Sequence, residues 1–189
     1  MRKITNLGDK FASLNLSFNT KTVALIGVMA ASVECAKLAL SFIPNVEVVS
    51  LLLALYGYVF GWMGVVCAFV FVLTEILVWG VGSWLVSYLI YWPMLAFMFM
   101  ILSKTGVRNR WILTLVIGVF TLLFGVLTSL VDGIVLFGIG DNFLKSIVLY
   151  YVRGIPFYLT QFVCNIGLFL TVFNYLADRL GMIRRKMLV

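Results

Sequence analysis

The sequence predicts an all-α integral membrane protein with six transmembrane helices and both termini in the cytoplasm. Composition is the first observation, because 63% of the 189 residues are hydrophobic and only 11% are charged. Soluble domains are about half apolar and about a quarter charged, so a soluble globular fold, a disordered chain and a disulfide scaffold are excluded. Apolar runs that follow one another along the chain are the second observation. The third is that the Lys and Arg residues, which give a net charge of +7, gather beside these runs.

The composition also excludes several kinds of chemistry. The chain has no histidine, so the usual general base and the commonest metal ligand are missing. Cys35, Cys67 and Cys164 all lie in apolar runs and form no CxxC pair, which is typical of buried thiols. No GxxxxGK run followed by Ser or Thr is present, so an ATPase site is excluded. We therefore expect no enzymatic activity, no metal site and no cofactor.

Three spans are predicted in the first part of the chain. The first runs from about residue 22 to 42 and ends at Ile43-Pro44-Asn45, after a polar cytoplasmic lead over residues 1–21. The next apolar stretch is about 35 residues long, whereas one span needs about 20. Glycines at 61 and 64 are typical of a tight turn, so we expect spans over 46–60 and 64–80.

The fourth and fifth spans follow from the next two breaks in hydropathy. A turn at residues 80–83, rich in glycine, precedes a span over about 84–102. The basic loop 103–110 then separates it from a fifth span over about 111–136.

The sixth span is predicted over about 155–176. Pro156 predicts that this helix begins or kinks there. The preceding segment, about 137–151, is less apolar and is long enough for a short helix or a lid. The membrane domain is therefore expected over residues 22–177 and a basic cytoplasmic tail over 178–189.

The basic residues test the number of spans. Six spans place all three basic clusters on one face, which the positive-inside rule identifies as cytoplasmic. An odd number of spans before the 103–110 loop would divide the clusters between two faces. The basicity is therefore attributed to topology in a lipid bilayer, with no nucleic-acid partner. The clusters are Arg2, Lys3, Lys10 and Lys21; Lys104, Arg108 and Arg110; and Arg179, Arg184, Arg185 and Lys186.

Charged residues inside the first and third spans need an explanation, because a charge in hydrocarbon is costly. Glu34 and Lys37 are three residues apart on one helical face. A mutual salt bridge is favoured for this pair, with a direct ligand role as the alternative. Glu75 has no basic residue within a helical turn, so its partner comes from another helix or from a ligand, and both remain open.

A polar face is also present on the fifth span. Asp132 ends a face that carries Thr121, Gly125, Thr128 and Ser129 at spacings of three and four. Packing between helices is favoured over a water-filled lining for these residues.

The sixth span carries a polar stripe. Tyr158, Gln161 and Asn165 lie on one helical face, and Arg153 lies near the mouth of the span. Two amides on one face of an apolar helix are difficult to explain by contact with lipid. Hydrogen bonding between helices and a ligand site both remain open.

Aromatic residues in the fourth span, Trp84, Tyr88, Tyr91 and Trp92, recur at helical spacing. They form either an interfacial belt or the wall of a pocket that stacks on a flat ring. Trp79 and Trp84, beside the 80–83 turn, are the better candidates for the belt. Most of the unusual polar residues lie toward the non-cytoplasmic side, which predicts a pocket that opens outward.

The chain from about residue 21 to 179 resembles the substrate-binding S components of energy-coupling factor (ECF) vitamin transporters, most of all Firmicutes members whose substrate is unassigned. The resemblance rests on size, six spans, cytoplasmic ends and several local runs. These runs are TVALIGVMAAS, LALSFIPNVEVVSLLLALYGYVFGW, FVFVLTEILVWGVGSWLVSYLIYWPML and VRGIPFYLTQFVCNIG.

The resemblance implies a function. S components bind a vitamin or a related micronutrient on the outside of the bacterial plasma membrane. They then dock onto one membrane-coupling protein and two ATPase subunits, and they topple in the bilayer to release the substrate inward. An aromatic pocket with amides and few charges favours a ring-containing molecule such as a flavin, pyridoxine, a thiamine or cobalamin precursor, or another heterocycle.

The resemblance also implies roles for individual residues. Docking uses small residues on the first span, for which Gly27-x-x-x-Ala31 is the nearest match and Ser32-x-x-x-Ala36 lies on an adjacent face. Packing within the protein is the alternative for these positions. Family sites lie in spans four to six and the first outer loop, and Glu75 on the third span is a less typical position. The expected substrate-binding residues are Asn45, Glu47, Glu75, Tyr88, Tyr91, Trp92, Arg153, Tyr158, Gln161 and Asn165.

Other functional classes compete with transport. A six-span scaffold of the rod-shape type would bind no small molecule. An intramembrane enzyme would use Glu75 and Asp132 as paired carboxylates, without a histidine or metal motif to assist them. A standalone secondary carrier is disfavoured because six spans show no two-fold repeat of broken helices.

Overall fold

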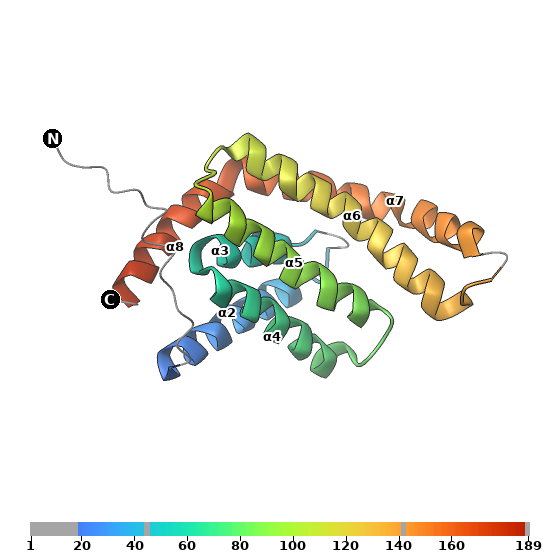
Figure 1. Cartoon of the computed structure of the whole chain (residues 1–189), viewed down its shortest axis with the longest axis horizontal. Helices are drawn as coiled ribbons and strands as arrows, with labels where there is room; N and C mark the ends of the chain where they lie inside the picture. Colours follow the sequence, from blue (N-terminus) through green and yellow to red (C-terminus); the bar gives the residue numbers. More distant parts are fainter. Residues whose placement is uncertain (1–18, 44–45, 141–142, 188–189) are drawn as a thin grey trace.

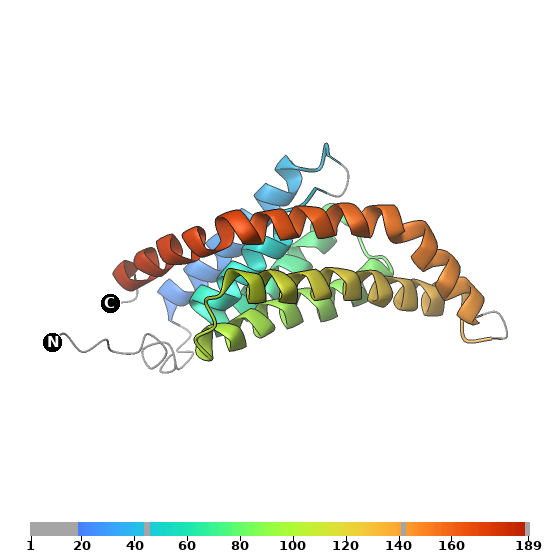
Figure 2. The ribbon, with the colours of Figure 1, turned by 90° about the horizontal axis from the view of Figure 1, so that it is seen from above.

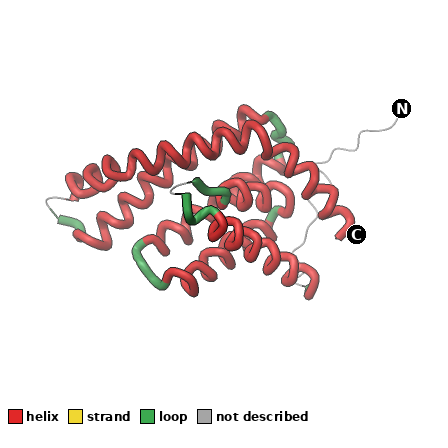
Figure 3. The backbone as a smooth tube through the Cα atoms, turned by 180° about the vertical axis from the view of Figure 1, so that it is seen from behind, coloured by secondary structure: helices red, strands yellow, loops and turns green. Residues whose placement is uncertain are grey.

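The computed structural model describes residues 19–43, 46–140 and 143–187, and all the regular secondary structure within these ranges is helical. The all-α class is therefore confirmed for the described part of the chain (Figure 3). The elements are α2 (Thr20–Ala39), α3 (Val49–Phe60), α4 (Trp62–Trp79), α5 (Trp84–Lys104), α6 (Arg110–Phe137), α7 (Phe143–Leu168), the π-helix η1 (Phe169–Phe173) and α8 (Asn174–Met187).

Within these ranges, five helical segments are long and apolar enough to cross a membrane, so the chain is a multi-pass membrane protein. They are α2, α4, α5, α6 and the continuous segment from α7 to α8. The predicted second span corresponds to α3, which has only 12 residues. The number of six complete crossings and the cytoplasmic position of the termini stay predictions.

The helices form two groups (Figure 1). The helices α2 to α5 cluster together, and α6 and α7 form a long antiparallel hairpin that extends beyond them. Seen from above, α7, η1 and α8 form one long bent helix that runs the length of the molecule (Figure 2).

The short helix α3 lies at the centre of the first group. It is apolar on every side, and nearly all of its residues are buried against α4, α5, α2 and α8. Gly57 allows α3 and α5 to approach closely, because a Cβ atom there would lie 2.0 Å from the Ala96 carbonyl oxygen. A helix that is apolar all round belongs in the interior, and α3 follows this rule.

The predicted turn between the second and third spans is confirmed. Gly61 separates α3 from α4 with φ 62° and ψ −126°, a conformation that favours glycine. Gly80 ends α4 in the same way, with φ 74°. These two glycines explain why an apolar stretch of about 35 residues folds as two helices rather than one.

The predicted start of the sixth span is wrong. The helix begins at Phe143 rather than near residue 155, and Pro156 lies inside α7. A proline in a helix removes one backbone donor, which leaves the Val152 carbonyl oxygen without its helical hydrogen bond, and transmembrane helices tolerate such prolines. Residues 143–151, considered above for a short helix or a lid, form the first turns of α7.

The helix also continues beyond the predicted end of the sixth span. Residues 178–187, expected as a basic tail, belong to α8, which packs against α3. The buried guanidinium of Arg184 donates to the Val59 carbonyl oxygen at 2.6 Å. Arg108, in the loop between α5 and α6, forms an ion pair with Asp178 of α8. Two of the basic clusters therefore lie at the same end of the molecule, as the predicted topology requires.

Candidate ligand-binding pocket

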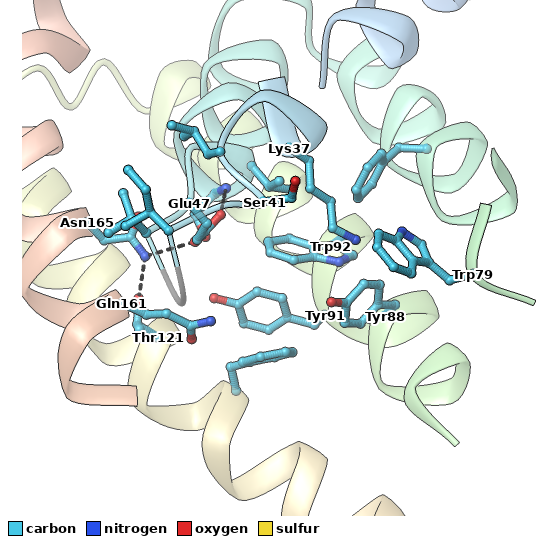
Figure 4. Close-up of a pocket in the computed structure, with 17 residues that line it drawn as sticks. Lys37, Ser41, Glu47, Trp79, Tyr88, Tyr91, Trp92, Thr121, Gln161 and Asn165 are labelled. Carbon is cyan, nitrogen blue, oxygen red and sulfur yellow. Dashed lines mark hydrogen bonds between the residues drawn. The ribbon is translucent and has the colours of Figure 1, made fainter. Parts of the chain in front are cut away.

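A cavity of about 210 Å³ lies between the two groups of helices. Its walls come from the end of α2, the connection to α3 and the start of α3, from α4 and the first half of α5, and from the middle of α6 and the second half of α7. Figure 4 shows that Glu47 and Asn165 lie at one end of this pocket and Lys37, Trp79 and Tyr88 at the other, with Tyr91 and Trp92 between them. The pocket therefore has an acidic end, a basic end and an aromatic wall.

Glu47 organises the acidic end. Its carboxylate accepts hydrogen bonds from the Ser50 backbone N–H at 3.0 Å and the Ser50 hydroxyl at 2.6 Å. It thereby satisfies an otherwise unpaired N–H in the first turn of α3. The Asn165 amide nitrogen on α7 donates to the same carboxylate at 3.3 Å and to the Thr121 hydroxyl on α6 at 3.1 Å. This network joins the loop before α3 to both helices of the hairpin.

The Asn165 side-chain oxygen is buried and receives no hydrogen bond among the described residues. Asn165 is only 1% exposed. The positions of its amide nitrogen and oxygen follow from hydrogen bonding, because the atom that faces the Glu47 carboxylate has to be the N–H donor. An acceptor without a donor is costly in a buried position, so the two hydrogen bonds of the amide nitrogen hold the side chain in place at the expense of its oxygen.

The aromatic wall comes from α5 and α6. The Tyr91 ring lies 4.7 Å from that of Trp92 and 4.6 Å from that of Phe124. The rings of Tyr88 and Trp92 are 5.6 Å apart and nearly perpendicular. The Trp92 indole N–H is buried and has no acceptor among the described residues. The wall therefore offers apolar ring faces together with the hydroxyl groups of Tyr88 and Tyr91 (Figure 4).

Lys37 forms the basic end. Its ammonium pairs with Glu75 on α4, and lies 5.7 Å from the centre of the Trp79 ring and 5.5 Å from that of Tyr88. The expected salt bridge between Glu34 and Lys37 is therefore wrong. Glu75 is 1% exposed and has no other cation beside it in the part of the chain that the structure describes, so the flexible lysine reaches across from α2 to α4.

Glu34 lies close to both members of this ion pair. Both of its carboxylate oxygens are buried and receive no hydrogen bond from the described residues. One ammonium therefore stands beside two carboxyl groups at the basic end of the pocket.

Six of the residues predicted from the sequence line the pocket together: Glu47, Tyr88, Tyr91, Trp92, Gln161 and Asn165. Glu75 lies behind Lys37, and its partner comes from another helix rather than a ligand. Asn45 lies outside the described residues.

Arg153 and Tyr158 lie outside the pocket. Arg153 is exposed. The Tyr158 ring fills the space over Gly125 of α6, where a Cβ atom would lie 2.7 Å from it, and its hydroxyl shares a hydrogen bond of 3.2 Å with Thr128. The polar stripe on α7 thus divides into a packing residue, Tyr158, and two pocket residues, Gln161 and Asn165.

Sequence reasoning missed several lining residues. Trp79 was expected in an interfacial belt and Thr121 in helix packing, yet both line the pocket. Phe124 and Phe71 gave no sequence signal, because a phenylalanine in an apolar span is not distinguished from any other core residue.

Asp132 has a structural partner of its own. The hydroxyl of Ser83, in the turn before α5, donates to the Asp132 carboxylate at 2.6 Å, while Glu75 pairs with Lys37. No group of three or more His, Cys, Asp or Glu side chains in the described ranges is arranged to hold a metal ion.

The two small-residue pairs on α2 differ in exposure. Gly27 and Ala31 are exposed, and a Cβ atom at Gly27 would meet nothing within 4 Å. The Ser32 hydroxyl instead donates to the Met29 carbonyl oxygen and shares a hydrogen bond of 2.6 Å with Tyr56 on α3. Ser32 therefore packs within the protein, Ala36 is half-buried, and the face with Gly27 and Ala31 is turned outward.

Comparison with known proteins identifies no relative: no protein-family model matches the chain, and neither a curated protein nor a solved structure is significantly similar to it.

Proposed function

We propose that the chain is the substrate-capture S component of an ECF-type importer in a bacterial plasma membrane. It binds a vitamin or a related heterocyclic micronutrient in the pocket and delivers it through a shared module of one membrane-coupling protein and two ATPase subunits. The chain itself has no catalytic role in this proposal.

The observation that carries the proposal is a cavity that combines an aromatic wall with polar side chains from helices far apart in the sequence. Its lining brings Glu47 and Gln161 together with the rings of Tyr91 and Trp92. A scaffold has no use for such a cavity, whereas a ring-containing ligand can use both the ring faces and the polar groups.

The position of the pocket also supports capture from outside. Its lining includes the connection between α2 and α3 and the end of α4. The basic residues of the α5–α6 loop and α8 are concentrated at the other end of the helices (Figure 1). If the end of the helices that carries these Lys and Arg residues is cytoplasmic, the pocket belongs to the outer half of the bundle.

The exposed face of α2 supports docking to a membrane partner. Small residues four apart allow two helices to approach closely in lipid. Gly27 and Ala31 meet this requirement without being used for internal packing. We assign this face, rather than the one with Ser32 and Ala36, to the coupling protein.

Affinity purification from membranes in mild detergent tests the proposal. We expect one heterocyclic metabolite to copurify, together with a coupling protein and ATPase subunits. Asn165→Leu should lose the metabolite, whereas Arg153→Gln, on the same helix but outside the pocket, should retain it. Copurification with a cell-wall complex, and with no metabolite, would instead identify a scaffold.

A further inference from the structure

The pocket has room for only a small ligand, and its polar groups differ between its two ends. We infer that it takes a single-ring nitrogen heterocycle, uncharged or cationic, with hydrogen-bond donors at one end and a neutral acceptor at the other. This inference rests on the proposed function and narrows it to a substrate class.

The volume of the cavity sets the size of the ligand. A cavity of about 150 Å³ holds one benzene molecule. The pocket, at about 210 Å³, therefore holds one ring with a few small substituents. Pockets for drug-sized ligands are usually about 300–1,000 Å³. Flavins and cobalamin precursors, which the sequence left open, exceed this volume.

The acidic end selects for donors on the ligand. Glu47 is a carboxylate that lines the pocket, and it is only partly buried. Its oxygens accept hydrogen bonds and donate none. A ring N–H, an amino group or a hydroxyl group on the ligand complements this end, and a positive charge there would be attracted to Glu47.

The opposite end selects for an acceptor that carries no negative charge. Lys37 lines this end and has three N–H donors, of which one is used on Glu75. The remaining donors suit a carbonyl oxygen or a ring nitrogen.

The charges around the pocket disfavour an anion. Glu34, Glu47 and Glu75 lie in or beside it, and Lys37 is the one cation in the described lining. A phosphate or carboxylate on the ligand would add negative charge to a region already rich in carboxyl groups, with little solvent to screen it. The ring itself packs against Tyr88, Trp92 and Phe124.

Matched compounds test charge and size separately. The purified full-length chain, stripped of copurifying molecules by detergent washing, is titrated with nicotinamide against nicotinate and with pyridoxine against pyridoxine phosphate. Riboflavin tests the size limit. We expect the uncharged member of each pair to bind at least about tenfold more tightly than the anionic member, about 1.4 kcal/mol, and riboflavin not to bind. Gln161→Leu, a half-buried lining residue, should weaken the binding that is seen.

The outcomes separate this inference from the proposed function. The inference is overturned if nicotinate or pyridoxine phosphate binds more tightly than its uncharged counterpart. It is also overturned if riboflavin binds and Gln161→Leu weakens that binding. Either result would leave the capture of a small molecule intact. If none of the five compounds binds, the molecule that copurifies with the chain tests the inference instead. A single-ring compound without phosphate or carboxylate supports the inference, and any other compound overturns it. If nothing binds and nothing copurifies, the proposed function fails as well.

Discussion

Lys37 on α2 pairs with Glu75 on α4, and this contact forms the basic end of the pocket. The lysine is surrounded by the rings of Phe71, Trp79 and Tyr88, at 5.5 to 5.9 Å from each ring centre. Glu34 lies beside the pair as a second carboxyl group. The ion pair therefore holds two helices of the first group together and also defines one wall of the proposed binding site.

One ammonium lies beside two carboxyl groups, so removing Lys37 and removing Glu75 should affect stability unequally. Lys37→Met leaves two buried carboxyl groups without a cation, and we expect it to destabilise the fold by about 3–5 kcal/mol. Glu75→Gln leaves Glu34 to pair with Lys37, so we expect a smaller loss. Thermal unfolding of the detergent-purified variants measures the difference. Equal losses for the two variants would show that Glu34 does not take over as a partner.

The close approach of α3 and α5 predicts which glycine the fold depends on. Gly57→Ala places a methyl group against the Ala96 backbone, and we expect a loss of about 1–3 kcal/mol of stability from overpacking. Gly27→Ala is the matched control, because its added methyl group meets nothing and alanine favours a helix by up to about 1 kcal/mol. Equal stability of these two variants in thermal unfolding would contradict the helix packing described here.

The exposed face of α2 predicts a separation of binding from transport. A bulky residue at Gly27 or Ala31, such as Ala31→Trp, should leave ligand binding unchanged and block uptake in cells. Leu115→Trp, at an exposed position on α6, is the control and should leave both unchanged. Loss of ligand binding in Ala31→Trp would instead assign this face to packing within the protein.

The division of the polar stripe on α7 predicts different roles for Tyr158 and Gln161. Tyr158→Phe removes the hydrogen bond to Thr128, so we expect a loss of about 0.5–1.5 kcal/mol of stability with ligand binding intact. Gln161→Leu should weaken ligand binding with little effect on stability. A binding measurement and a melting curve on each variant check this, and the reverse pattern would place Tyr158 in the site.

The sequence predicted those parts of the fold that depend on local signals. Hydropathy located the apolar segments, and the turns at Gly61 and Gly80 are visible as glycines because their positive φ favours that residue. The predicted start of α7 was wrong because Pro156 was expected to begin or kink the helix, whereas a proline is tolerated inside a long transmembrane helix. The continuation through η1 into α8 was not predicted, because hydropathy falls along that segment although its apolar residues keep helical spacing.

The candidate site could be predicted only in part, because residue type indicates that a group is unusual but not where it points. Gln161 and Asn165 stood out as amides in an apolar span, and Glu47 was expected from the resemblance through its place in the first outer loop. All three line the pocket. Tyr158 shares their helical face, yet its ring turns toward Gly125, a contact that depends on the neighbouring helix. The pairing of Lys37 with Glu75 depends in the same way on how α2 packs against α4.

Native mass spectrometry of the full-length chain, released from mild detergent, tests the central claim most directly. The account predicts one small organic molecule bound to each copy of the wild-type chain and none bound to Asn165→Leu. A wild-type chain that carries no such molecule, after purification from cells grown in rich medium, would contradict it.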